Sequence, residues 1–305
     1  MILQELLDEY LLTLRNRETL RSYSSILGRL VRFLGPDRDI ASVRARDILA
    51  WQKALLDQDR RYTDHPRHPE QDGGLAPMTV YKNLVTVRGF WQYAVTMEYI
   101  DCSPMRGLSI RQPPCPSAFE KAAPLTTLRA LLPVAEQRPR DRAMYLFLLD
   151  TGCRAGAVCR LQIDRLDLTN RRAWVTEKRG RQHKAVFGEE TAEALATWLD
   201  ARPDMPAREV FLSRRTKRAL TTRGLSAWLR ALCAEAGVDP IGPHAIRHAV
   251  GCYLALEGEP LSLIRDLLGH EDARTTASFY MPDGEEALRA MVERSGLVRL
   301  LRQAD

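Results

Sequence analysis

The spacing of apolar residues predicts helices through the first third of the chain. The helical period of 3.6 residues recurs in four segments, residues 2–14, 19–34, 46–57 and 78–99. Thr19 is a candidate N-cap of the second helix. Residues 60–77 lack any period and are rich in proline, glycine and charge, which predicts a loop. Three aromatic residues of the fourth helix are expected to pack in a core rather than stack on bases: Phe90, Trp91 and Tyr93.

A proline-rich segment without periodicity, residues 109–124, separates this region from the rest and is the best candidate for a linker. Two short β-type runs, residues 172–177 and 183–187, are joined by KRGRQ, which predicts a hairpin with Gly180 in its turn. The helical period predicts further helices over residues 125–136, 140–150, 190–201, 222–236, 243–256, 261–268 and 285–301. The pattern therefore predicts a mainly α (α+β) chain with a first domain over 1–110, a linker over 111–124 and a larger domain over 125–305.

Composition adds a weak preference for a polyanionic partner. The 305 residues carry 45 basic and 39 acidic side chains, a net charge of +6. A nucleic-acid surface therefore has to come from local clustering of charge. The six cysteines contain no CxxC pair, which is typical of reduced thiols in a cytosolic protein. No signal peptide or membrane-spanning run is found, so we expect a soluble, cytoplasmic protein.

The segment GPHAIRHAVG places unusual chemistry on one helix. Pro243 suits a first helical turn, so His244 and Arg247 share a face and His248 lies one turn beyond His244. A zinc hydrolase helix would read H-E-x-x-H, but Ala245 stands in the place of the glutamate. A permanent cation at Arg247 suits an anion better than a divalent metal. An anion site is therefore favoured over a zinc site or a solvated helix face.

Three other segments carry residues that fit the same chemistry. Arg154 follows a Thr-Gly turn at an expected helix start, and Lys178 lies at the hairpin. His270 follows LLG, and Tyr280 comes ten residues later. Each of these residues alone has an ordinary interpretation as a solvated charge or a packing side chain. Lysine is nevertheless rare here, with six among the 45 basic residues, so a lysine at the hairpin is informative.

Together these segments resemble the tyrosine recombinase family, the phage-integrase-like and Xer-like proteins. TGCR resembles the first-arginine box, Lys178 the hairpin lysine, HAIRH the H-x-x-R-H box, and LGH with Tyr280 the last box. TLRSY and the run from MTVYKNL to YIDCSP resemble the helical core-binding domain. The resemblance implies a helical, SAM-like core-binding domain and a larger, mostly helical catalytic domain with a small antiparallel sheet, the fold of DNA breaking–rejoining enzymes.

The resemblance implies a site-specific recombinase or integrase that cleaves duplex DNA through a 3′-phosphotyrosyl link. Neither ATP, metal nor any other cofactor is expected. Tyr280 would be the nucleophile, and with a pKa near 10 about one phenol in a thousand is ionised at pH 7. Arg154 and Arg247 would grip the non-bridging oxygens with forked donors. Lys178 would protonate the 5′-oxygen, which completes the transfer.

Two histidines complete the implied set. His244 would move the proton of the nucleophile, and His270 would bond the scissile phosphate. Two departures from the family pattern stand out. Ala157 occupies the place of an acidic residue, so we expect its supporting hydrogen bonds to be missing or replaced. Tyr280 lies one residue farther from His270 than usual, with Phe279 in the usual place, so either a bulge restores its aim or the site is impaired.

Two alternatives stay open. One is a catalytically impaired DNA-binding relative of the same fold, and the other is a type IB topoisomerase-like activity, against which the integrase-like first domain argues.

The expected partners are double-stranded DNA with specific sites and further copies of the chain, as a tetramer on DNA. The apolar strip of the last helix would dock on a neighbour or on its own domain: Leu288, Met291, Val292, Leu297 and Leu300. Eight cations are candidates for contacts with DNA phosphates, with a solvated surface as the alternative: Arg21, Arg179, Arg181, Arg214, Arg215, Lys217, Arg218 and Arg223.

Overall fold

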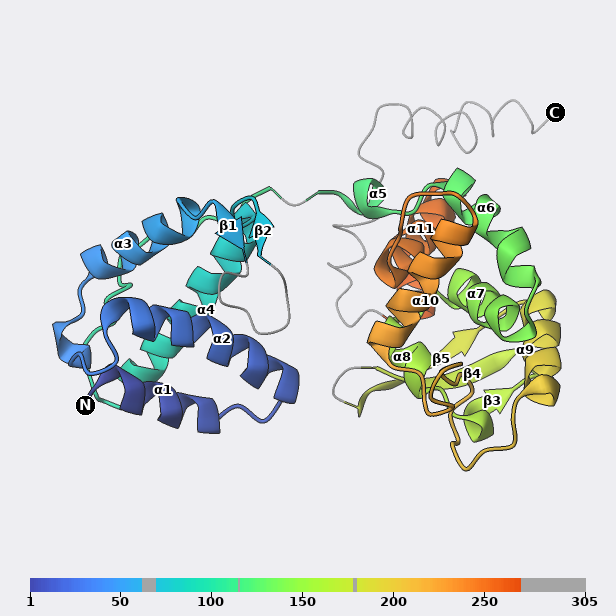
Figure 1. The fold of residues 1–305 in the computed structure, drawn as a ribbon, viewed down its shortest axis with the longest axis horizontal. Coiled ribbons are helices and arrows are strands. Elements are labelled where there is room, and N and C mark those ends of the chain that lie inside the picture. Colours follow the sequence, from blue (N-terminus) through green and yellow to red (C-terminus); the bar gives the residue numbers. More distant parts are fainter. Residues whose placement is uncertain (62–69, 115, 178–179, 270–305) are drawn as a thin grey trace, which may run out of the picture. The chain divides into compact units, whose positions relative to one another are not determined.

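The computed structural model describes residues 1–61, 70–114, 116–177 and 180–269. The chain divides into two compact units, Met1–Cys115 and Pro116–Asp305 (Figure 1). The elements of the first unit are α1 (Leu3–Leu12), α2 (Arg17–Leu34), the 3₁₀ turn η1 (Ile40–Ser42), α3 (Ala45–Leu56), β1 (Arg60–Arg61), β2 (Gln71–Asp72) and α4 (Pro77–Thr96). The four predicted helices of this region are therefore present, with ends that differ by at most three residues.

The second helix starts earlier than the sequence predicted. Thr19 is not its N-cap: the carboxamide oxygen of Asn16 accepts hydrogen bonds from the backbone N–H of Glu18 at 2.9 Å and of Thr19 at 3.1 Å. Asparagine is a strong N-cap because its short side chain reaches the second and third N–H groups of the helix. The cap therefore adds Arg17 and Glu18 to α2.

The aromatic residues of α4 form the centre of the first core. Phe90 and Trp91 are fully buried, and the ring of Tyr10 on α1 meets Phe90 edge-on at 5.5 Å. Tyr93 is partly buried, and its hydroxyl donates to the carboxylate of Glu9 at 2.6 Å. Core packing of Phe90, Trp91 and Tyr93 is thus confirmed, and α4 joins the unit through its aromatic face.

The second unit carries the remaining elements. They are α5 (Ala118–Lys121), α6 (Leu125–Glu136), α7 (Pro139–Thr151), α8 (Ala155–Arg160), the 3₁₀ turn η2 (Ile163–Arg165), β3 (Leu166–Asp167), β4 (Arg172–Thr176), β5 (Gln182–Val186), α9 (Glu189–Ala201), α10 (Thr222–Glu235), α11 (Pro243–Leu256) and α12 (Leu261–Leu268). The sequence predicted no element between residues 111 and 124, yet α5 lies there and packs against α11. Ala118 is fully buried in that contact region, which explains why the short turn is held.

A small antiparallel sheet is enclosed by these helices. Its strand order is β3-β4-β5, and Val175 pairs with His183 in the β4–β5 hairpin. The predicted hairpin is confirmed, and Gly180 in its turn has a φ of 77°. Strand β4 contacts α8, while β5 contacts α7 and α12. The sheet is therefore packed against three helices.

The mainly helical fold with a small antiparallel sheet is confirmed. Within the described part of the chain, no helix has the length and apolar character needed to span a membrane.

Candidate active site

Arg154 is placed by a tight turn between α7 and α8. Helix α7 ends at Thr151, and Gly152 adopts a left-handed conformation with a φ of 54°. A Cβ at Gly152 would lie 2.5 Å from Cδ2 of Leu268, so glycine is needed both for backbone conformation and for space. Arg154 then takes the N-cap position of α8, with 32% of its side chain exposed. The Thr-Gly turn therefore presents Arg154 at the surface of the site.

Arg247 links two segments that are remote in the sequence. Pro243 is in the first turn of α11, as predicted, and Arg247 lies one turn later with 4% exposure. Its Nη1 donates to the carbonyl of Gly152 and its Nη2 to the carbonyl of Leu268, both at 2.8 Å. These carbonyls stand two residues before Arg154 and two residues before His270. The guanidinium thus sets the spacing of the segments that carry two other candidates.

Glu177 provides a carboxylate partner for Arg154. Its Oε2 lies 2.9 Å from Nη1 of Arg154, and only 5% of the glutamate side chain is exposed. Ala157, in the family's usual acidic position, is fully buried. We expected the hydrogen bonds of an acidic residue at position 157 to be missing or replaced; in the structure Arg154 pairs with Glu177, at the end of the hairpin strand.

The charges of Arg154 and Arg247 both act on two further side chains, His183 and Cys153. Burial lowers the pKa of His183, and the nearby charges of Arg247 and Arg154 act in the same direction, while Glu177 opposes them. Burial raises the pKa of the Cys153 thiol to about 11, against the influence of the same two arginines. The guanidinium groups of Arg154 and Arg247 therefore lie close to a common pair of neighbours, which brings these two candidates together.

The direction of the His183 shift has a consequence for stability. A histidine whose pKa is lowered in the folded protein is held neutral, and its protonation opposes folding. This contribution to stability is present above the ordinary histidine pKa of 6.5 and is lost as the pH falls below it. His183 acts as a neutral imidazole beside the arginines at pH 7.

Of the other catalytic candidates, only His244 lies within the described residues. His244 is exposed on the first turn of α11. Lys178, Arg179, His270 and Tyr280 lie outside the described residues. Glu177 and Gly180 are described on either side of Lys178 and Arg179, and Gly269 is described just before His270.

The basic cluster predicted to contact phosphates lies at the surface. Arg214, Arg215, Lys217, Arg218 and Arg223 are exposed, as are Arg21 and Arg181.

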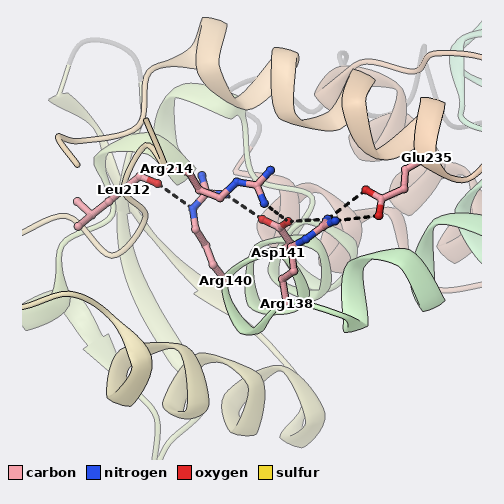
Figure 2. Close-up of polar contacts among 6 residues, drawn as sticks. All are labelled: Arg138, Arg140, Asp141, Leu212, Arg214 and Glu235. Carbon is pink, nitrogen blue, oxygen red and sulfur yellow. Dashed lines mark hydrogen bonds and ion pairs between the residues drawn. The ribbon is translucent and has the colours of Figure 1, made fainter. Parts of the chain in front are cut away.

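Arg214 also has an internal contact. Its Nη1 lies 3.5 Å from the buried carboxylate of Asp141, which is also paired with Arg138 and Arg140 (Figure 2). The backbone of the cluster is therefore anchored while much of the Arg214 side chain stays accessible.

Sequence reasoning missed Glu177 and His183. The alternation of β4 and β5 could have indicated them, because both lie on the sheet face that also carries Ala173, Val175 and Ala185. A charged or polar residue on an inward face calls for a partner. Among the described residues, no group of three or more histidine, cysteine or acidic side chains could hold a metal ion, so the zinc interpretation of HAIRH gains no support.

Comparison with known proteins now decides the family. The sequence model described as the phage integrase family matches residues 125–286, more than half of the chain. This chain belongs to the phage integrase family. The resemblance to tyrosine recombinases is thereby confirmed, and with it the prediction of a tyrosine-type site-specific recombinase.

Curated relatives agree over most of the length. The tyrosine recombinase XerC of Mycobacterium bovis (strain BCG / Pasteur 1173P2) is 28% identical over 233 residues, which cover 73% of this chain and 78% of that protein. The tyrosine recombinase XerC of Mycobacterium sp. (strain JLS) is 27% identical over 285 residues, which cover 88% of this chain and 90% of that protein. The similarity therefore includes both units.

Solved structures share the fold. The Tn1549 transposon integrase, in complex with transposon right end DNA, has a TM-score of 0.74 at 16% identity and covers 96% of this chain and 99% of that one. A lambda integrase dimer bound to a COC′ core site has a TM-score of 0.68 at 16% identity, with 90% and 97% covered. The XerA recombinase has a TM-score of 0.52 at 21% identity, with 96% and 97% covered.

Proposed function

We propose that this chain cleaves and rejoins double-stranded DNA at specific sites through a 3′-phosphotyrosyl intermediate, without metal or ATP. The observation that carries the proposal is the position of Arg247, whose guanidinium bonds the carbonyls of Gly152 and Leu268 at 2.8 Å. A phosphodiester that is opened without metal needs a preorganised cationic clamp on its oxygens. Arg154 and Arg247, fixed beside common neighbours, supply such a clamp.

The remaining steps follow from the chemistry of the candidate side chains. The phenol hydroxyl of Tyr280 gives its proton to His244 as its oxygen attacks phosphorus, and the bond to the 5′-oxygen breaks. Lys178 donates a proton to that oxygen, which leaves as a 5′-hydroxyl, and His270 donates a hydrogen bond to the phosphate. The reverse attack by the 5′-hydroxyl of another strand restores a diester and releases Tyr280. The energy of the original ester is kept in the phosphotyrosyl bond, so no external energy source is needed.

Contacts with DNA are proposed for both units. A groove between α2 and α4 in the first unit is lined by three cations, Arg21, Arg29 and Lys82, and by one acid, Glu18, together with serine, threonine and tyrosine side chains. Such a lining suits a phosphate backbone, because cations and hydroxyls fix register without reading sequence. We assign the first unit to clamping of the DNA and residues 125–305 to catalysis. The Tn1549 and lambda integrases were solved in complex with DNA, which supports DNA as the partner of this chain, and we expect a cytoplasmic location.

Covalent trapping tests the proposed function. Nicked duplexes that tile the DNA flanking the gene let the cleaved 5′-hydroxyl fragment dissociate, so a cleaving enzyme remains attached to its site. We expect attachment of the full chain in the presence of a metal chelator, measured as a shift in denaturing gel electrophoresis. Tyr280→Phe is expected to remove attachment, because the substituted side chain has no nucleophilic oxygen.

A matched control is Tyr253→Phe, which changes a partly buried tyrosine of α11 in the same unit and should leave attachment intact. Attachment that persists in Tyr280→Phe would show that another residue is the nucleophile. Specific DNA binding without attachment by the unchanged chain would identify a catalytically impaired relative instead. Relaxation of supercoils without exchange of partners would identify topoisomerase-like activity.

Self-association on DNA is proposed through the last helix. The larger unit has an apolar groove of about 420 Å³ between α6 and α11, lined by residues that include Leu128, Leu132 and Leu254. The apolar strip predicted over residues 285–301 matches such a groove in character, and we assign it as the occupant, supplied by a neighbouring copy in a tetramer.

Truncation tests this assembly. Removal of residues 285–305, or Leu254→Asp in the groove, is expected to abolish four-copy complexes on paired sites in sedimentation, with attachment to single nicked duplexes retained. A tetramer that survives either change contradicts the assignment. Loss of attachment along with assembly would indicate that the strip packs on its own unit.

A further inference from the structure

Glu177 is a buried carboxylate at the end of the inward-facing side of the sheet. Ala173 and Val175 precede it on the same face of β4 and are fully buried, while Glu177 itself is 6% exposed. Its backbone N–H donates to the carbonyl of Arg181 at 2.7 Å, so the residue is held by the hairpin ladder. A carboxylate at such a depth is costly unless its charge is compensated. Its presence therefore calls for an explanation beyond packing.

The two oxygens of this carboxylate are used differently. Oε2 forms the 2.9 Å ion pair with Nη1 of Arg154, while Oε1 is buried and has no hydrogen-bond partner among the described residues. The glutamate side chain is 5% exposed and the arginine side chain 32% exposed. The carboxylate thus holds the guanidinium from the inside, and the outer part of Arg154 faces solvent, where a phosphate would arrive.

The surroundings of the pair are polar and enclosed. His183, diagonal to Glu177 across the β4–β5 ladder, has both ring nitrogens buried without a hydrogen-bond partner in the described part of the chain. Its ring packs so closely on Gly269 that a Cβ there would lie 2.7 Å from Cε1. Glu177 therefore belongs to a buried polar cluster, formed with His183 beside Arg154 and Arg247, and it supplies the negative charge of that cluster.

We infer that Glu177 is a positioning residue that aims the guanidinium of Arg154 at the scissile phosphate. This inference rests on the proposed function and adds a residue that acts only through Arg154. A forked guanidinium on a long side chain has many rotamers, and an ion pair on its inner edge removes most of them before the substrate binds. The clamp is then preorganised, so the arginine need not be reoriented during the reaction.

The first test measures the rate of single-turnover attachment to a nicked substrate. Glu177→Gln keeps the shape and removes the charge, and we expect a loss of about 10- to 100-fold in rate, because a displacement of about 1 Å in a catalytic group can cost about 100-fold. Affinity for DNA is expected to stay within about threefold, since Glu177 itself does not face the DNA. Glu177→Asp keeps the charge and is expected to give an intermediate rate.

The second test asks whether Glu177 acts through Arg154. In an Arg154→Lys background the forked donor is absent, so Glu177→Gln should change the rate by less than about threefold. A structural role would instead lower the rate by the same factor in both backgrounds. Asp167→Asn is the matched control, because it breaks a carboxylate–arginine pair of the same 2.9 Å length in the same sheet. We expect this control to attach at the rate of the unchanged chain.

The outcomes separate this inference from the proposed function. Failure of the unchanged chain to attach overturns the proposed function. Attachment by the unchanged chain with an equal or faster rate for Glu177→Gln overturns the positioning role alone. Equal losses in both backgrounds overturn it as well. Glu177→Gln could fail to fold while Glu177→Asp folds. If Glu177→Asp then attaches, in each background, as fast as the same background with Glu177 unchanged, the carboxylate serves the fold and the inference is also wrong.

Discussion

Asp141→Asn is expected to destabilise the larger unit by about 3–5 kcal/mol, the cost of leaving a buried ion without its partner. The Asp141 carboxylate is fully buried and lies 2.9 Å from Nη1 of Arg140, which is itself 7% exposed. Burial lowers the pKa of Arg140, and the Asp141 charge counters that effect. The asparagine amide has no charge to offer, so the buried guanidinium would keep its desolvation cost without compensation.

The surrounding network explains why the effect should spread. Arg138 lies between Asp141, at 3.5 Å, and Glu235 on α10, at 2.8 Å (Figure 2). Arg140 also donates from Nε to the carbonyl of Leu212 at 2.7 Å. One carboxylate thus ties α7 to α10 and to the segment that carries Arg214. Its loss should loosen the contacts on which the exposed basic cluster depends.

Native-state hydrogen exchange of the α7 and α10 amides in the full chain checks this prediction, because it reports the larger unit separately. Glu190→Gln is the matched control: it breaks the 3.1 Å Arg142–Glu190 pair between α7 and α9, whose glutamate side chain is 61% exposed. An exposed pair contributes about 0–1 kcal/mol, so protection should hardly change. Equal protection in Asp141→Asn and the unchanged chain would contradict the expected role of the carboxylate.

Helix positions followed well from the sequence where an apolar stripe is long. The segments that became α1, α2, α3 and α4 carry enough turns for the period of 3.6 residues to be recognised. The two-residue strands β1, β2 and β3 and the four-residue helix α5 were missed, because so few residues cannot display a period. Strand β3 pairs with the nearby β4, while α5 is held by α11, which is distant in sequence.

The site was only partly predictable for a related reason. Arg154 and Arg247 could be named because each lies in a local motif, a Thr-Gly turn or a helical H-x-x-R-H segment. Glu177 and His183 belong to no local motif, and their importance arises where β4 pairs with β5, which also contacts α7 and α12. The alternation of the hairpin showed which face they share, but not that two guanidinium groups lie against that face.

Arg247→Lys is expected to lower the single-turnover rate of attachment by about 10²–10³, the usual cost of removing a donor from an oxyanion site. The planar guanidinium bonds two carbonyls, of Gly152 and Leu268, in different directions at 2.8 Å. A lysine ammonium is a point donor and cannot reproduce that fork. At least one buried carbonyl would lose its partner, and the segments leading to Arg154 and His270 would lose their common anchor.

Arg247→Lys should lower the attachment rate without lowering DNA affinity. This difference distinguishes a residue that organises the site from one that only attracts DNA through its charge. Arg247 is 4% exposed and net charge is unchanged in the lysine variant, so affinity at fixed salt should stay within about threefold. Arg265→Lys on α12, whose arginine is exposed and paired with the neighbouring Asp266, should alter neither quantity. A rate for Arg247→Lys close to that of this control would mean that the two carbonyl contacts do not organise the site. A loss of affinity equal to the loss of rate would mean that Arg247 contributes to binding DNA and not to the chemical step.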